Sequence, residues 1–459
     1  MGLARLPHRI PRRAFAVLFL ALPLAIALAR STGVAARGPN DDVDYVADIE
    51  HAVDRIGEEC RALLDAKEID WKKVGREFVK AAKKTKSDDE HFVQLVRLLA
   101  RLRDGHAEAR WLPKDRSPVL PEEWRTEKEG PGMFWCTIDG DLYVKNAWNA
   151  AEDNGVEPGM RIVTVDGEKA EKWLQARIEE LSDVISFSTE QQARFFACHQ
   201  GLADVPGTRL KLELVGVDGK KTKRTITITK ANPTPWGPAY APEGTQNSNE
   251  AKDLYFAKLP QGYGWLQIRR CKEDLPRQID VALEALGDVD GLILDFRGNS
   301  GGGFDHEDLM GRFVPKGSSL DFAKHYESTG AHPYGGPIVV IVDATVRSAG
   351  ETASSIFRED GRAYLIGESP TAGMSSQKTT IELPSGLAEL YVSTNSNLGR
   401  ANGGKGLEGI GTIPHELVEF KATDLAAKRD TLIRRACELL ADYPVREVPY
   451  DPAKAGWRQ

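Results

Sequence analysis

One stretch of the chain is apolar at every position, unlike the periodic patterns elsewhere. Ile338–Val342 contains five consecutive β-branched residues. An unbroken run of this length is typical of a strand that is buried on both faces of a parallel sheet. After a turn over residues 343–347, apolar residues return at helical spacing until Gly361, which provides a stop. The pattern predicts a strand, a turn and a helix, with Ser348 where the helix begins.

Three further patterns organise the rest of the chain. Apolar residues recur at helical spacing from about residue 43 to 103, which predicts a small helical module. Residues 130–230 contain short alternating runs and Asp-Gly turns, which predict a β-rich module. From residue 251 strand and helix patterns alternate, as in a parallel sheet. There the predicted strands are 264–269, 291–296, 338–342 and 363–366, and the predicted helices are 275–286, 306–313, 349–360 and 425–440, with a hairpin around 384–386.

These patterns predict an α/β fold class and divide the chain into six parts. The expected boundaries are 1–36 for a signal peptide, 40–115 for an N-terminal helical module, 130–230 for the β-rich domain, 231–250 for a linker, 251–424 for the core, and 425–459 for a C-terminal helix and tail. A chain of 459 residues has room for two or three domains, in agreement with this division.

The amino terminus has the features of a secretory signal. Four arginines precede an apolar run over residues 14–29, and the small residues Val34-Ala35-Ala36 follow it. This order of basic, apolar and small residues is that of a signal peptide. Pro23 interrupts the apolar run, which is short for a stable membrane span, although an uncleaved anchor stays an alternative. We expect export, to the periplasm or the extracellular space.

Composition narrows the classes of partner. The chain is 41% hydrophobic and 28% charged, which is ordinary for a globular protein. A net charge of −7 without a basic stripe argues against a nucleic-acid partner. The five cysteines are widely spaced and contain no Cys-x-x-Cys pair, which argues against a zinc ribbon. We expect mostly buried thiols, at least one of them unpaired, and no cofactor or metal.

The position of Ser348 and a glycine run elsewhere point to one kind of chemistry. A helix N-terminus presents free backbone N–H groups and a positive dipole end, which stabilise an anion. Gly298–Gly303 follows another buried strand but lacks the Gly-Lys-Ser/Thr ending of a nucleotide-binding loop. If both strands share a sheet, the N–H groups of Gly301 and Ala349 converge on one carbonyl oxygen, as acyl transfer requires. A helix-capping role for Ser348 is the simpler alternative.

Four segments together carry a family resemblance. They are Asp295-Phe296-Arg297-Gly298-Asn299-Ser300-Gly301-Gly302, Arg347-Ser348-Ala349-Gly350-Glu351, Gly367-Glu368-Ser369-Pro370-Thr371-Ala372-Gly373 and Gly409-Ile410-Gly411-Thr412-Ile413-Pro414. In this order they resemble the C-terminal processing peptidase and tricorn protease family, over roughly residues 255–419. The resemblance implies a serine peptidase core built as a βαβ sandwich, with Ser348 as the nucleophile and a protein or peptide as the substrate.

The family activates its serine in two ways, and the resemblance favours one of them here. One branch uses a lysine, but this chain has Met374 at the matching position, and methionine cannot accept a proton. Lys378 lies four residues later and requires an altered loop to replace it. The tricorn-like branch uses a histidine and a glutamate, which His106 and Glu408 match. Histidine can take the serine proton and return it to the leaving amine, while the glutamate holds the imidazole.

Two neighbouring positions depart from this simple assignment. Asp104, two residues from His106, is a rival orienter of the imidazole, although so short a spacing favours a turn-forming role. His415 stands where the family usually has aspartate after the proline, a position that is not catalytic.

The β-rich module carries a second resemblance. Residues 154–162 are similar to a recurring phrase of PDZ domains, although Met160 replaces the usual aspartate and the segment 182–205 is longer than a minimal module needs. PDZ domains bind peptide ends by adding a strand to a sheet edge. We expect this module to select substrate without supplying chemistry.

Two other functions stay open at this stage. A non-catalytic ligand- or peptide-binding protein on the same fold is the main alternative, although such a protein has no reason to keep serine, histidine and glutamate together. An esterase with a Gly-x-Ser-x-Gly elbow fits poorly, because Val346 replaces the first glycine. The sequence leaves cleavage specificity and oligomeric state open.

Overall fold

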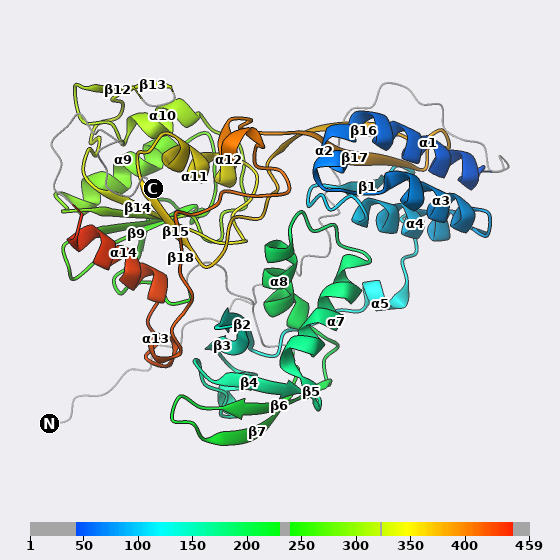
Figure 1. Cartoon of the computed structure of the whole chain (residues 1–459), viewed down its shortest axis with the longest axis horizontal. Helices are drawn as coiled ribbons and strands as arrows, with labels where there is room; N and C mark the ends of the chain where they lie inside the picture. The colour runs from blue at the N-terminus through cyan, green and yellow to red at the C-terminus, as the bar shows by residue number, and fades with distance from the viewer. Residues whose placement is uncertain (1–42, 230–238, 322–323, 444–459) are drawn as a thin grey trace, which may run out of the picture. The chain divides into compact units, whose positions relative to one another are not determined.

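The computed structural model describes residues 43–229, 239–321 and 324–443 (Figure 1). The expected signal peptide and the last part of the predicted tail, residues 444–459, lie outside these ranges. None of the helices in the described ranges has the length and apolar character that crossing a membrane requires.

A seven-stranded sheet forms the core of the predicted peptidase region. Its order is β18-β15-β14-β11-β10-β9-β8, with β10, β11, β14, β15 and β18 parallel and the β9 and β8 edge antiparallel. The strands are β8 (Gln246–Asn247), β9 (Leu254–Lys258), β10 (Gly264–Ile268), β11 (Leu292–Asp295), β14 (Ile338–Val342), β15 (Tyr364–Gly367) and β18 (Glu416–Leu417). The α/β class is confirmed, and β8 lies within the range expected to be a linker.

The unbroken apolar run becomes an interior strand of this sheet, β14. All five residues of β14 are fully buried, between β11 and β15. Burying one such side chain stabilises the fold by roughly 1.5–3 kcal/mol, which makes this strand a major source of core stability. The helices α9 (Leu275–Leu286), α11 (Ala349–Glu359) and α14 (Thr431–Ala441) contribute side chains to the same apolar core. Smaller elements of this region are α10 (His306–Gly311), β12 (Ser319–Asp321), β13 (His325–Glu327) and α12 (Ala401–Gly404).

The predicted C-terminal helix over 425–440 is wrong as a single helix. The structure has α13 (Ala422–Ala426) and then α14, with Lys428 between them at a φ of +53°. Asp430 caps α14 by accepting from the backbone N–H groups of Leu432 and Ile433. Its other carboxylate oxygen accepts from the buried guanidinium of Arg297 at 2.9 Å. The break therefore places a carboxylate against a buried cation, which apolar periodicity does not reveal.

The N-terminal helical module is built partly from the core segment. Its helices are α1 (Tyr45–Glu59), α2 (Arg61–Ala66), α3 (Trp71–Ala82) and α4 (Asp88–Ala100), followed by β1 (Glu108–Trp111) and α5 (Glu122–Arg125). The predicted hairpin is present as β16 (Ser376–Glu382) and β17 (Ala388–Ser396), and β17 pairs with β1 (Figure 1). Apolar residues of this three-stranded sheet and the helices form one cluster. The chain after Ser348 thus returns to the helical module.

The β-rich module has its own sheet and apolar cluster. The sheet order is β2-β3-β4-β6-β7, with β5 paired to β4. Its elements are β2 (Met133–Ile138), β3 (Asp141–Ala147), α6 (Ala150–Asp153), β4 (Arg161–Val165), β5 (Glu168–Lys169), α7 (Ala170–Ser182), α8 (Glu190–Cys198), the 3-10 turn η1 (Gln200–Leu202), β6 (Arg209–Val215) and β7 (Lys221–Thr227). The long segment 182–205 contains α8, which becomes important at the site described next.

The cysteines follow the sequence expectation. Each of the five is a free thiol, and four are buried while Cys437 is partly exposed. Burial raises the pKa of Cys60 and Cys271 to about 12, so these thiols stay protonated at neutral pH.

Candidate active site

Ser348 lies at the junction of β14 and α11, as the apolar pattern predicts. It is the residue before the first turn of α11, and its backbone has a φ of +56° and a ψ of −126°. A non-glycine residue in this region is strained, and such strain is commonly found where a turn presents a nucleophile. Ser348 also takes part in a capping box with Glu351, so the helix-capping role is present at this strained turn.

The glycine loop after β11 packs directly against this turn. A Cβ atom added to Gly301 would lie 2.7 Å from Cβ of Ser348 and 3.2 Å from the backbone nitrogen of Ala349. Gly301 also has a φ of +83°, so both space and conformation require glycine. Gly301 and Ala349 are thus neighbours, as the sequence analysis expects. The N–H of Gly301, however, donates to Oδ1 of Asn299 at 2.8 Å, while Ala349 opens the helix.

Glu351, which sequence reasoning did not single out, fixes the turn to a second loop. Its fully buried carboxylate accepts from the backbone N–H of Ser348 at 3.1 Å. It also accepts from the hydroxyl of Thr371 at 2.6 Å and from the N–H groups of Gly373 and Met374, both at 2.7 Å. Burial raises the pKa of Glu351 to about 8, against the opposing effect of these donors. One side chain therefore orders both segments.

The loop 371–374 connects the serine turn to the predicted glutamate. The N–H of Ala372 donates to the carbonyl oxygen of Val346, two residues before Ser348, at 2.9 Å. The N–H of Gly409 donates to the carbonyl oxygen of Gly373, also at 2.9 Å. Glu408 and the serine turn are therefore held by the same short loop.

Met374 closes the loop 371–374 against the segment that carries His106. A Cβ added to Gly105 would lie 2.5 Å from Sδ of Met374, so the two residues are in close contact. The sulfur accepts a hydrogen bond from Nε2 of Gln192 at 2.7 Å, and the side chain is buried. The methionine at the family's lysine position is a packing residue here, because it fills the space beside the histidine loop.

His106 lies in the loop after α4, held by the carboxylate of Asp104. Oδ1 of Asp104 accepts from the backbone N–H of His106 at 2.9 Å, which is the turn-forming contact expected from the spacing. Ser393 satisfies the rest of this carboxylate, with its hydroxyl on Oδ1 at 2.9 Å and its N–H on Oδ2 at 2.8 Å. Burial and the charge of Lys378 lower the pKa of His106 to about 4. The imidazole is therefore neutral at pH 7, the form that can accept a proton.

Glu408 is buried beside the imidazole. Its Oε1 accepts from Nζ of Lys67 at 2.8 Å and from the hydroxyl of Ser188 at 3.2 Å. Its Oε2 and Nδ1 of His106 are both buried and have no hydrogen-bond partner within the described part of the chain. Burial raises the pKa of Glu408 to about 7, although Lys67 opposes the shift.

Asp104, His106 and Glu408 form one cluster, each offering an atom within 4.8 Å of the others. Three such ligands could hold a metal ion in geometric terms. The charges oppose this use, because the Lys67 ammonium pairs with Glu408 and the Asp104 carboxylate is already fully engaged. Lys378 also lies close enough for its charge to act on His106. The cluster is better suited to holding and transferring a proton.

Lys378 lies near the cluster without an acidic partner among the described residues. Its ammonium donates to the carbonyl oxygen of Ser376 at 2.7 Å, and burial lowers its pKa. Within the described ranges it is therefore a lysine near His106 that forms no ion pair, and it needs a direct test as a rival base.

The β-rich module contributes side chains to the same loops. The hydroxyl of Thr189 donates to the carbonyl oxygen of Ala372 at 2.9 Å. The amide of Gln191 donates to the carbonyl oxygens of Thr371 and Ile410, at 3.0 and 3.1 Å. With Ser188 and Gln192, these residues form a short segment before and in α8 that supports the site. The signal for it in the sequence was only the unusual length of 182–205.

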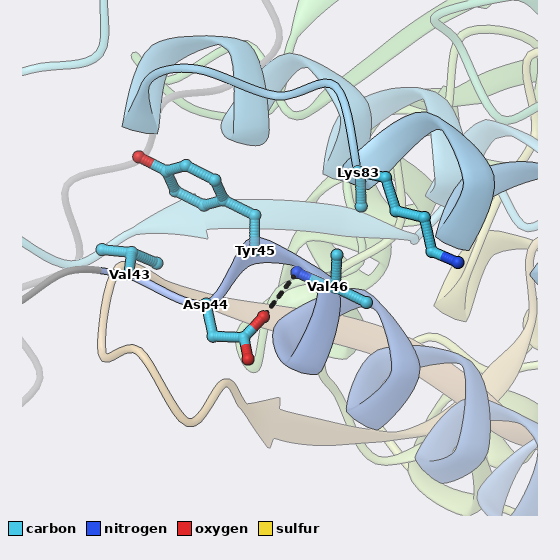
Figure 2. Close-up of a pocket in the computed structure, with 6 residues that line it drawn as sticks. Val43, Asp44, Tyr45, Val46 and Lys83 are labelled. Atoms are coloured by element: carbon cyan, nitrogen blue, oxygen red, sulfur yellow. Dashed lines mark hydrogen bonds between the residues drawn. The ribbon is translucent and has the colours of Figure 1, made fainter.

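A separate surface pocket lies on the helical module, around the start of α1 (Figure 2). It encloses about 350 Å³ and is lined by Val43, Asp44, Tyr45, Val46, Ala82 and Lys83. The Asp44 carboxylate accepts from the N–H of Val46 at 3.1 Å, a helix-capping contact (Figure 2). None of these residues belongs to the cluster around His106, so this pocket is not the candidate active site.

Comparison with known proteins agrees with the geometry. Residues 262–418 match the model of peptidase family S41, and all four segments that carry the resemblance lie within this range. A curated protein of Chlamydia pneumoniae is 31% identical over 100 residues, which is 22% of this chain and 16% of that protein. The aligned part thus spans about a sixth of the length of this relative.

Solved structures share the fold over most of the chain. Mature CPAF has a TM-score of 0.59 at 12% identity, covering 87% of this chain and 98% of that chain. Mature CPAF complexed with lactacystin has a TM-score of 0.58 at 13% identity, covering 87% and 99%. At such identities the likeness shows the fold, and the family rests on the matched segment. The resemblance that the motifs indicate is confirmed over residues 262–418, the segment that matches peptidase family S41.

Proposed function

We propose that this protein is an exported serine peptidase that cleaves peptide bonds through an acyl-enzyme, with Ser348 as nucleophile, His106 as base and Glu408 as the residue that orients the base. The observation that carries the proposal is the loop 371–374. It bonds to the serine turn through Val346 and to the Glu408 loop through Gly409, and Met374 packs against Gly105 beside His106. This arrangement supports the proposal that Ser348, His106 and Glu408 act on the same bound substrate.

The chemistry follows from the state of each group. A serine hydroxyl is a weak nucleophile at neutral pH and needs a base within hydrogen-bond reach. Neutral His106 takes the proton of Ser348 as the hydroxyl oxygen attacks the substrate carbonyl carbon. The developing oxyanion lies at the N-terminus of α11, where the N–H of Ala349 donates to it. The N–H of Gly301 adds a second donor once Asn299 releases it.

Proton return completes the cycle. The imidazolium gives its proton to the leaving amine, the peptide C–N bond breaks and an ester to Ser348 remains. Water then loses a proton to His106 and attacks the ester carbonyl, which regenerates the serine hydroxyl and releases the acid. Oε2 of Glu408 pairs with Nδ1 of His106, so that Nε2 faces the serine and the transient positive charge is stabilised. This pairing forms in the proposed cycle; in the structure both atoms are buried and have no hydrogen-bond partner among the described residues, so they are available to each other.

A fluorophosphonate probe tests the proposal against the binding-protein alternative. We expect covalent labelling at Ser348, lost in Ser348→Ala, and a roughly million-fold loss of turnover in that variant. Ser355→Ala on the same helix is the matched control and keeps both properties. Peptide cleavage that persists in purified Ser348→Ala ends the serine-peptidase proposal, and a folded wild-type protein that neither labels nor cleaves favours a binding protein.

Export is the part of the proposal that rests on sequence alone. The basic, apolar and small-residue order of residues 1–36 supports it. N-terminal sequencing of the protein recovered from the exported fraction tests it, with a start near residue 37 expected. Full-length protein found only inside the producing cell contradicts export.

A further inference from the structure

Lys67 makes a buried ion pair with Glu408 at the candidate site. It follows α2, and its ammonium donates to Oε1 of Glu408 at 2.8 Å and to the carbonyl oxygen of Arg103 at 2.6 Å. The Lys67 side chain is 9% exposed and that of Glu408 is fully buried. A pair so removed from water is costly to break, because one charge is then left without compensation.

The packing around the pair leaves little freedom to the ammonium. A Cβ added to Gly409 would lie 2.8 Å from Cε of Lys67, so the lysine stem occupies the space beside the residue that follows Glu408. The guanidinium of Arg103 in turn donates to the carbonyl oxygen of Lys67. Three segments far apart in sequence therefore hold the ammonium against one oxygen of the carboxylate.

We propose that Lys67 is a positioning residue of the active site, which keeps Glu408 ionised and turns its free oxygen toward His106. This inference rests on the proposed function, since it assigns Lys67 a role in the same proton transfer. Lys67 and Ser188 occupy Oε1, whereas no residue in the described part of the chain bonds to Oε2. Lys67 binds one carboxylate oxygen of Glu408 and leaves the other for the imidazole of His106. A lysine that competed with His106 for Glu408 would instead bind the oxygen that the imidazole needs.

The surrounding charges explain why Glu408 needs this cation. Besides burial, the charge of Asp104 raises the pKa of Glu408, and the charge of Glu408 in turn raises the pKa of Glu351. Both acidic groups therefore disfavour a negative charge on Glu408. His106 is neutral at pH 7 and supplies no countercharge. Lys378 is positively charged but forms no ion pair with Glu408 in the described chain. Burial and the charge of Asp104 raise the pKa of Glu408, whereas Lys67 and the hydroxyl of Ser188 lower it, and Lys67 is the contact that carries a positive charge.

Lys67→Met tests the inference, because it removes the charge and keeps an apolar stem. We expect kcat/KM on a peptide substrate to fall roughly 10- to 100-fold at pH 7, as for other partners that orient a reacting group. The acid side of the pH profile moves to higher pH, since Glu408 without the cation holds its proton longer, and the loss becomes smaller at high pH. Lys72→Met, at an exposed position on α3, is the matched control and leaves the profile unchanged.

A double-mutant cycle separates positioning from general stability. In a Glu408→Gln background, Lys67→Met should cost little more, because the charge it serves is already gone. The inference is overturned if the losses of the two variants add fully, or if Lys67→Met loses the same activity at every pH. Increased activity in Lys67→Met also overturns it, because the ion pair would then hold the site in an inactive state. Lys67→Gln replaces Lys67→Met if thermal unfolding shows that the latter does not fold. Near-normal activity in Glu408→Gln alone instead overturns the proposed function itself.

Discussion

Oε2 of Glu351 lies 3.1 Å from the backbone nitrogen of Ser348 and accepts its hydrogen bond. The same carboxylate accepts from the hydroxyl of Thr371 and from the N–H groups of Gly373 and Met374. Four donors on one buried carboxylate hold the strained serine turn to the loop that packs beside His106. The geometry of the proposed nucleophile therefore depends on a residue that takes no part in bond making.

Glu351→Gln is expected to damage the site without removing any reacting group. The glutamine amide would direct an NH₂ group at donors, and each donor left without an acceptor costs about 1–3 kcal/mol. We expect a lower thermal unfolding midpoint and slow labelling of Ser348 by a fluorophosphonate. Glu359→Gln, on the same helix but partly exposed, is the control and should behave as wild type. Normal labelling of Glu351→Gln would show that the Ser348 turn keeps its conformation without the Glu351 carboxylate.

The sequence predicted the elements whose signal is local. The apolar run of β14, the turn and Ser348 follow from adjacent residues, and α9 spans the range that its apolar face indicates. The neighbouring positions of Gly301 and Ser348 also followed, because the carboxyl ends of two parallel strands meet at one edge of the sheet.

The parts that could not be predicted depend on distant contacts. Lys67 and Glu408 are 341 positions apart, and neither residue type marks the pair. Glu351 looked like an ordinary acidic residue in the first turn of a helix, because its partners come from a loop twenty residues later. The hairpin of β16 and β17 was expected, but pairing with β1 depends on where the chain folds back. Apolar periodicity predicts a helix or strand and the face that it buries. It does not predict which other element packs against that face.

The pH dependence of cleavage should report Glu408 more than an isolated imidazole. The pKa of Glu408 is raised to about 7 and that of His106 is lowered to about 4. The active form needs ionised Glu408 and neutral His106, so kcat/KM should rise with pH through about 7. Glu408→Gln should cost roughly ten-thousand-fold, by analogy with loss of the triad acid elsewhere, and should also remove this step from the residual activity. A step that remains near 7 in Glu408→Gln would assign it to another group.

The contacts of the segment 188–192 change what the β-rich module is expected to do. Its side chains bond to Thr371, Ala372 and Ile410, so we expect the module to support the candidate site in addition to the substrate selection predicted for it. Gln191→Ala removes two of these bonds, and we expect roughly tenfold lower kcat on long and short peptides alike. Gln175→Ala, exposed on α7, is the control. A loss confined to long substrates would restore the purely selective role.

The identity of the base is the sharpest question, because one candidate, His106, lies in the cluster and another, Lys378, lies near it. Lys378 has a lowered pKa and no acidic partner among the described residues, while His106 is neutral and faces a buried carboxylate. A lysine base must lose its proton near neutral pH, but half-burial and nearby Asp104 and Glu408 act in opposite directions on Lys378. We therefore expect His106→Ala to be nearly as damaging as Ser348→Ala, and Lys378→Ala to keep most of the activity.

Met374→Lys completes this comparison. The methionine is buried against Gly105 and its sulfur accepts from Gln192, so an ammonium placed there would lose its water and would face the Gln192 donor. We expect Met374→Lys to lower the thermal unfolding midpoint. Combined with His106→Ala in one protein, it should not restore activity. Single-turnover cleavage at several pH values distinguishes the two bases. With a lysine base, the rate should begin to rise at a much higher pH than with the His106 and Glu408 pair. Loss of activity in Lys378→Ala, with His106→Ala near wild type, would replace the proposed triad by a displaced serine–lysine dyad.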